Sequence, residues 1–101
     1  MAIRYVVAEA DAEGIHAIDA RSLQGVRVNS VAPGLIRTPL AEELLGNEGF
    51  MARRLASTPL RRVGEPDEIA GVVVILASRA GGFITGQNLV VDGGTTMSDG
   101  N

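Results

Sequence analysis

The sequence predicts an α/β fold in which two parallel strands are joined by a helical crossover. A run rich in β-branched residues at 26–32 is typical of a buried strand. A strongly apolar helical pattern occupies 66–78, and a second buried strand is predicted at 88–94. This order of elements favours a right-handed crossover, and we expect residues 1–101 to form a single domain.

The first element along the chain is a predicted helix over residues 6–20. This stretch is rich in acids, and Gly14 lowers its helix propensity by about 1 kcal/mol relative to alanine. The strand at 26–32 then ends at the corner Pro33-Gly34. Proline cannot donate to a strand ladder, and glycine lets the backbone turn sharply or approach another segment closely.

Two short helices are predicted after the corner. Thr38 followed by Pro39 is the pattern of an N-cap with proline at the first helical position. The first helix spans 39–45 and ends at Gly46, and Asn47 is placed to cap the second. A strand, a glycine corner and a helix N-terminus in succession are where α/β proteins place ligands.

The helix predicted at 66–78 is the clearest element of the chain. Pro66 suits its first position, and the acids that follow lie where the helix dipole favours negative charge. A core-facing stripe follows the 3.6-residue period, through Ile69, Val72, Val73 and Leu76. The opposite side is apolar as well, for example at Val74, so we expect burial on two sides, the second against another subunit.

Composition excludes several classes of function. The net charge of −3 argues against a nucleic-acid surface, and the longest apolar stretch, at 72–77, is far too short for a membrane span. The absence of cysteine fits a cytoplasmic protein and excludes thiolate metal sites. His16 is the only histidine and has no partner at a metal-ligand spacing, so no metal site is predicted.

Three motifs, in this order, resemble the C-terminal part of the short-chain dehydrogenases/reductases: VRVNSVAPGLIRTP, TPLRRVGEPDEIAGVVVILAS and FITGQNLVVDGG. The match runs from about residue 25 to residue 94. The resemblance implies a partial Rossmann-like fold, with the last two parallel strands of the family's sheet, lid helices over 39–62 and one long helix. It also implies NAD or NADP as cofactor, with neither preferred, and a small alcohol or carbonyl as substrate.

The resemblance assigns cofactor contacts to the corner after the first strand. It implies that Pro33-Gly34 passes beneath the nicotinamide ring and that the backbone of Ile36 meets the carboxamide. The hydroxyl of Thr38 is implied to reach the carboxamide or the pyrophosphate. Elementary chemistry agrees, since a helix N-terminus with a capping hydroxyl presents donors to an amide oxygen or a phosphate.

Two family motifs have no counterpart in this sequence. The glycine-rich turn that cradles the pyrophosphate is absent, so cofactor binding is expected to be weak or absent. The family's catalytic tyrosine stands four residues before a lysine; Tyr5 falls near that place, but position 9 is Glu9, and all nine basic residues are arginine. Without a neighbouring cation Tyr5 suits only proton donation during carbonyl reduction. Alternatively, residues 1–24 are unrelated to that helix and Tyr5 is an ordinary surface aromatic.

Two hypotheses of function therefore stand side by side. The first is an NAD(P)-linked alcohol/carbonyl oxidoreductase. The second is a non-catalytic oligomeric or interaction module derived from one. In either case we expect a homodimer or tetramer built on residues 66–78 and 88–94, because two strands cannot cover their own sheet and the strand at 26–32 would keep an unpaired edge.

Overall fold

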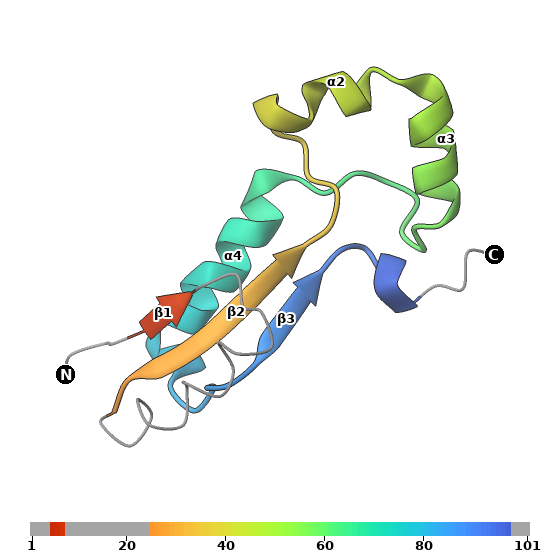
Figure 1. The fold of residues 1–101 in the computed structure, drawn as a ribbon. Helices are drawn as coiled ribbons and strands as arrows, with labels where there is room; N and C mark the ends of the chain where they lie inside the picture. The colour runs from red at the N-terminus through yellow and green to blue at the C-terminus, as the bar shows by residue number, and fades with distance from the viewer. Residues whose placement is uncertain (1–4, 8–24, 98–101) are drawn as a thin grey trace. The chain divides into compact units, whose positions relative to one another are not determined.

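The computed structural model describes residues 5–7 and 25–97 of the chain (Figure 1). The predicted α/β class is confirmed. In chain order its elements are β1 (Tyr5–Val7), β2 (Arg27–Pro33), the 3₁₀ turn η1 (Pro39–Ala41), α2 (Glu42–Leu45), α3 (Glu48–Ala56), α4 (Pro66–Ala77), the 3₁₀ turn η2 (Arg79–Gly81), β3 (Asn88–Val91) and the 3₁₀ turn η3 (Thr95–Met97).

These elements are distributed over two compact units. The first unit comprises Met1–Ala32 with Ala70–Val90, and the second comprises Pro33–Ile69 with Val91–Asn101. Each unit thus combines two stretches that are distant in the sequence. The candidate site described below lies wholly in the second unit.

The strands form one sheet in the order β1-β2-β3. β1 pairs with β2 in parallel, with Tyr5 opposite Arg27. β3 points the same way as β2 in Figure 1. Hydrogen bonds join the residues just before β3 to β2. The N–H of Gly86 donates to Val28 O over 2.8 Å, and the N–H of Ser30 donates to Gln87 O over 2.8 Å. The parallel pairing predicted for the two strands is therefore confirmed.

The predictions for the N-terminal region were wrong in two respects. Residues 6 and 7 of the helix predicted at 6–20 belong to strand β1, and the rest of that helix lies outside the described residues. The strand predicted at 26–32 was expected to keep an unpaired edge, but β1 pairs with that edge. Tyr, Val and Val are favourable strand residues, and pairing with β2 outweighs the weak helical pattern.

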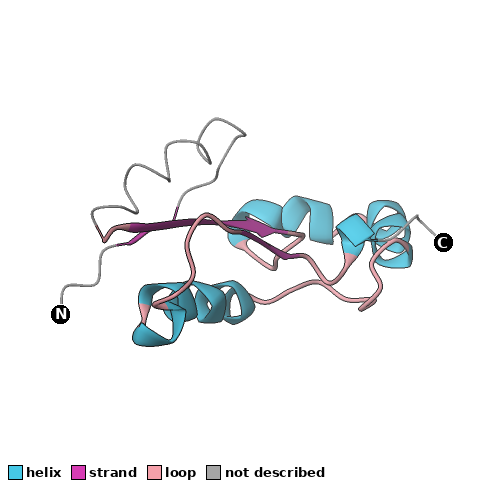
Figure 2. Ribbon diagram, turned by 90° about the horizontal axis from the view of Figure 1, so that it is seen from below, coloured by secondary structure: helices cyan, strands magenta, loops and turns pink. Residues whose placement is uncertain are grey.

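Helix α4 lies along one face of the sheet in the first unit (Figure 2). Leu76, the last residue of the predicted stripe, is 0% exposed and is the largest buried side chain among the described residues. On the other side of the helix, Val74 is 64% exposed and Ile75 is 51% exposed. The helix therefore covers the sheet with one face and leaves apolar side chains on the other.

Buried polar side chains of β2 hold the loop that precedes β3. Asn29 is almost fully buried; its Nδ2 donates to Ile84 O over 3.0 Å, and its Oδ1 accepts the N–H of Gln87 over 3.0 Å. Next to it, Ser30 Oγ donates to Asn88 Oδ1 over 2.8 Å. These bonds satisfy polar groups that would otherwise destabilise the interior.

In the second unit the predicted caps are in place. Thr38 Oγ1 accepts the N–H of Ala41 over 3.3 Å, with Pro39 at the first helical position. Asn47 Oδ1 accepts the N–H of Phe50 over 2.9 Å and begins α3. The helix predicted at 39–45 differs in detail, because it consists of η1 followed by the single turn α2.

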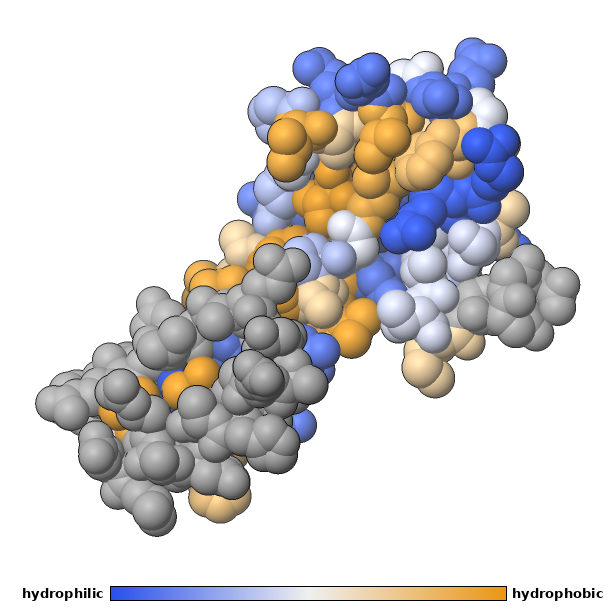
Figure 3. Space-filling view, in the orientation of Figure 1, coloured by the Kyte–Doolittle hydropathy of each residue, from blue (hydrophilic) through white to orange (hydrophobic). Residues whose placement is uncertain are grey.

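The C-terminus of α3 is closed by an arginine. Arg61 has a φ of 57°, in the left-handed region, and its guanidinium donates to Leu55 O over 3.0 Å and to Ala56 O. A cation at this end of a helix satisfies the last carbonyls and suits the dipole. Within the lid segment (residues 39–62), hydrophobic side chains gather on the surface, and Leu40 and Leu44 are exposed (Figure 3). No helix among the described residues has the length and apolar character needed to cross a membrane.

We predict that Asn29→Ala destabilises the protein by about 2 kcal/mol, because the substitution leaves the N–H of Gln87 without its side-chain partner and removes one of the two side-chain donors to Ile84 O, the other being Arg27. Urea denaturation measures the change. The matched control is Gln87→Ala, which removes an exposed side chain but keeps the backbone N–H, and it should stay within about 0.5 kcal/mol of the natural protein. Equal stabilities of the two variants would contradict the role assigned to Asn29.

Candidate functional site

The corner after β2 is closed against the end of β3. The N–H of Gly34 donates to Val91 O over 2.9 Å. A Cβ atom at Gly34 would lie 2.7 Å from Asp92 Cβ and 2.8 Å from Asp92 Cα, closer than real Cβ atoms approach. The glycine at this position is therefore required by the close approach of another segment, and that segment is Asp92.

The backbone of Ile36 is bonded on one side only. A parallel bridge joins Ile36 to Gly64, through the N–H of Arg37 donating to Gly64 O (2.9 Å) and the N–H of Gly64 donating to Leu35 O (3.0 Å). In this pattern the N–H and C=O of Ile36 itself point away from Gly64. No hydrogen bond between described residues uses either group. The site thus offers one amide donor and one carbonyl acceptor side by side.

The remaining residues of the corner are Pro33 and Thr38. Pro33 is the exposed last residue of β2. Thr38 is partly buried, and its oxygen accepts a bond from the helical turn, which leaves its own hydroxyl proton for another acceptor. The structure therefore places the four residues implied to contact the cofactor in one short segment of the second unit. Their role in binding stays a prediction.

The catalytic residue suggested by the resemblance lies in the first unit. Tyr5 begins β1, where its backbone is opposite Arg27. Glu9 and His16 lie outside the described residues. The structure does not test the role of Tyr5 as proton donor.

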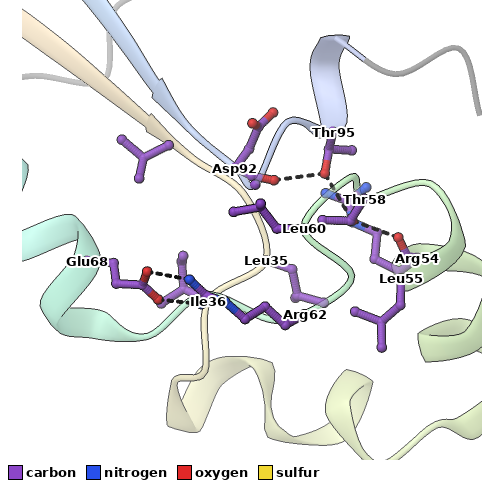
Figure 4. Close-up of a pocket in the computed structure, with 13 residues that line it drawn as sticks. Leu35, Ile36, Arg54, Leu55, Thr58, Leu60, Arg62, Glu68, Asp92 and Thr95 are labelled. Atoms are coloured by element: carbon purple, nitrogen blue, oxygen red, sulfur yellow. Dashed lines mark hydrogen bonds and ion pairs between the residues drawn. The ribbon is translucent and has the colours of Figure 1, made fainter.

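A pocket of about 100 Å³ opens in the second unit (Figure 4). It is lined by Leu35, Ile36, Arg54, Leu55, Thr58, Leu60, Arg62, Gly64, Glu68, Val91, Asp92, Gly93 and Thr95. Of these, only Ile36 was singled out from the sequence as a site residue. No local sequence pattern links Thr58 to Thr95.

Two hydroxyls form the polar wall of the pocket. Thr58 is 4% exposed, and its Oγ1 donates to Arg54 O over 2.8 Å. Thr95 Oγ1 donates to Asp92 O over 2.9 Å. The two hydroxyl oxygens lie 3.1 Å apart and face one another in Figure 4. The pocket wall therefore joins the segment just after α3 to η3 through side-chain oxygens.

An ion pair forms another part of the wall. Arg62 binds Glu68 in a bidentate arrangement, with distances of 2.6 Å and 2.7 Å. Glu68 also accepts the N–H of Glu65, as the third-position acid of a helix capping box does. Hydrogen bonding to Arg62, with the added bond from Glu65, lowers the pKa of Glu68 to about 2. The carboxylate of Glu68 therefore stabilises the start of α4, as expected for an acid in the first turn of a helix.

The carboxylate of Asp92 is held by backbone donors. It accepts the N–H of Thr96 over 2.9 Å and the N–H of Gly94 over 2.8 Å, and these bonds lower the pKa of Asp92. The turn that presents these donors requires glycine, because Gly93 and Gly94 have φ angles of 67° and 93°. Since both carboxylates of the pocket stay ionised near neutral pH, the pocket is suited to binding and not to proton exchange.

No cluster of three or more His, Cys, Asp or Glu residues that would suit a metal ion occurs within the described ranges. The chemistry available in the second unit is therefore that of hydrogen bonds, apolar contact and paired charges. These groups can position a small molecule or part of a nucleotide.

Comparison with known proteins identifies the family. A family model described as "Enoyl-(Acyl carrier protein) reductase" matches residues 5–96. A tropinone reductase homologue of Arabidopsis thaliana is 45% identical over 74 residues, which cover 73% of this chain and 28% of the relative. An NADP-dependent (R)-specific alcohol dehydrogenase of Lentilactobacillus kefiri is 51% identical over 71 residues, which cover 70% of this chain and 28% of the relative.

A solved structure gives the same answer. The complex of 4-hydroxyisoleucine dehydrogenase with NADH superposes with a TM-score of 0.75 at 35% identity, over 84% of this chain and 37% of the other. The chain thus spans little more than a quarter of the length of the two curated relatives, 28% in each case. The part that it spans forms a partial Rossmann-like sheet, and the chain belongs to the short-chain dehydrogenase/reductase family.

Proposed function

We propose that this chain forms the nicotinamide-binding side of an NAD(P)-linked oxidoreductase that interconverts alcohols and carbonyls. The observation that carries the proposal is the free amide N–H and C=O of Ile36, set between the glycine corner and the capping hydroxyl of Thr38. Membership of the family supports it, as do a relative named as NADP-dependent and a similar solved structure in complex with NADH.

The groups at the corner fit a nicotinamide. Its carboxamide carries one carbonyl acceptor and one amide donor, which complement the N–H and C=O of Ile36. The hydroxyl proton of Thr38 offers one further donor, and exposed Pro33 offers apolar surface to a ring face. The bond from Gly34 to Val91 and the bridge to Gly64 fix this backbone before any ligand arrives. When bound, the cofactor supplies the hydride chemistry, and the protein supplies position and electrostatics.

The proposal assigns proton donation to Tyr5 in the direction of carbonyl reduction. A protonated phenol can donate a proton at neutral pH and is a poor base there. The two carboxylates of the pocket are unsuited to the task because their pKa values are lowered. Both NAD and NADP remain within the proposal.

We predict that the chain alone binds NADH or NADPH with a dissociation constant no tighter than about 1 mM, or roughly 4 kcal/mol, because the corner offers only nicotinamide-side contacts. Isothermal titration calorimetry measures it. Thr38→Val should weaken whatever binding is found, and Thr38→Ser, which keeps both the hydroxyl and the helix cap, should retain it. Low-micromolar binding would contradict the expected weakness, and equal affinity of the Val and Ser variants would remove Thr38 from the site.

We further propose that the chain assembles as a homodimer or tetramer through residues 66–78 and 88–94. The support is apolar exposure in the first unit, where Val74 and Ile75 on α4 and Val90 on β3 are about half exposed or more. Parallel sheets and apolar helices are normally buried on both faces, so these side chains call for a covering surface. The same feature favours the second candidate function, a non-catalytic oligomeric module. Assembly without any cofactor binding would select the module over the oxidoreductase.

We expect Val74→Glu to lower both the assembly state and the melting temperature, because the variant places a charge in the middle of the proposed contact. Light scattering and thermal unfolding measure the two effects. Leu44→Glu, an equivalent change at an exposed leucine of the lid segment, is the control and should leave assembly unchanged. A stable, monodisperse monomer of the natural chain at micromolar concentration would contradict the proposed contact.

A further inference from the structure

We propose that the pocket of the second unit is a carboxylate-binding site, in which Arg54 holds the carboxylate of a short-chain organic acid. The planar guanidinium binds both carboxylate oxygens, and the alkyl part of the acid lies against the apolar wall. Three features of the pocket lead to this ligand: an arginine without a partner, wall carboxylates that are bonded elsewhere, and a small apolar cavity.

The arginine without a partner is Arg54. It belongs to the last turn of α3, is half-buried and lines the pocket. Its carbonyl oxygen accepts the hydroxyls of Ser57 and Thr58, which fixes the backbone at this point. No hydrogen bond or ion pair between described residues involves its guanidinium. A half-buried cation has lost part of its hydration without gaining a counter-charge, and the anionic group of a ligand supplies one.

The other charged side chains of the wall are already bonded. Arg62 and Glu68 form a bidentate pair, and in Figure 4 this pair lies on one side of the pocket and Arg54 on the other. The carboxylate of Asp92 accepts two backbone N–H groups of the turn that follows it. Neither carboxylate forms an ion pair with Arg54. Arg54 is therefore the charge of the wall that stays available to a ligand.

The end of α3 does not require Arg54. A cation in the last turn suits the helix dipole, but Arg61 already donates to Leu55 O and Ala56 O. The neighbouring Arg53 provides a further cation in the same turn, and it is exposed and does not line the pocket. What distinguishes Arg54 from Arg53 is its place in the pocket wall, and this difference points to a ligand.

The cavity selects an organic acid over an inorganic anion. Its volume is about 100 Å³. A cavity of about 150 Å³ holds benzene, so this one takes about four or five non-hydrogen atoms. Much of its wall is apolar, through Leu35, Leu55, Leu60 and Val91. A carboxylate with a short alkyl chain covers this surface and places its charge at the guanidinium, whereas phosphate would leave the surface uncovered.

The pocket shares Leu35 and Ile36 with the segment that leads out of the glycine corner. If the corner holds nicotinamide, Arg54 selects among the possible substrates those that carry a carboxylate, namely short hydroxy acids and the matching keto acids. This role in substrate selection rests on the proposed function, whereas binding of a carboxylate to Arg54 does not.

The test is a titration of the full chain, without cofactor, followed by ¹H–¹⁵N NMR at neutral pH and constant ionic strength. Propionate is the probe, and propionamide, which has the same size and shape but no charge, is the matched control. We expect saturable shifts at the amides of Leu55, Leu60 and Gly93. Propionate should bind about tenfold tighter than propionamide, because hydrogen bonds between charged groups are the stronger ones. Equal affinities for the two probes, or shifts that do not saturate, would overturn the proposal.

Inorganic phosphate separates an organic acid from anions in general. We expect it to bind more weakly than propionate, because it has no alkyl part to cover the apolar wall. Phosphate that binds at the same amides as tightly as propionate would show a general anion site and refute the assignment to carboxylates.

Three variants locate the site. Arg54→Gln removes the charge and should abolish the preference for propionate over propionamide. Arg53→Gln is the control, because it makes the same change in net charge at an exposed neighbour that does not line the pocket, and it should keep the preference. Arg54→Lys keeps the charge without the planar fork and should retain part of the preference. A preference that survives in Arg54→Gln, or that Arg53→Gln removes equally, refutes the inference, whatever the outcome of cofactor titration.

Discussion

The close approach of Gly34 to Asp92 is the constraint on which the second unit depends. With no side chain at residue 34, the corner after β2 comes close enough for its N–H to bond Val91 O. Asp92 then accepts hydrogen bonds from the backbone of the following turn, in which a Cβ atom at Gly94 would lie only 2.9 Å from Pro59 Cγ. The motif Pro-Gly and the motif Asp-Gly-Gly, far apart in the sequence, thus meet in a single packing arrangement.

This arrangement determines what the site can do. Because the corner is anchored by Val91 and Gly64, the polar groups of Ile36 are presented in a fixed position without help from a ligand. Because Thr58 is held against the turn after Asp92, its hydroxyl meets that of Thr95 and forms the polar wall of the pocket. Of the charged residues nearby, Arg62, Glu68 and Asp92 are committed to structural bonds. In the function proposed above, this unit provides orientation, and Tyr5 of the first unit is assigned the proton.

Much of the fold was predictable from local sequence patterns. The caps at Thr38 and Asn47 and the long helix follow from short-range chemistry, and the ordered motifs were sufficient for the family. Strand β1 was missed because three residues carry little periodicity, and its strand conformation depends on pairing with β2. The hydroxyl pair was missed because Thr58 and Thr95 are 37 residues apart. Gly34 was predicted to allow a sharp turn or a close approach, but its neighbour Asp92 is 58 residues away in the sequence and could not be identified from local patterns.

The stability of Gly34→Ala, compared with that of Gly71→Ala, tests the central constraint most directly. Around Gly71, within α4, nothing lies within 4 Å of an added Cβ. Urea denaturation should therefore show Gly71→Ala stabilised by up to about 1 kcal/mol, as alanine exceeds glycine in a helix. Gly34→Ala should be destabilised by about 1–3 kcal/mol, because the new methyl group meets Asp92. If Gly34→Ala is as stable as the natural protein, the corner is not held by this contact and the account of the second unit fails.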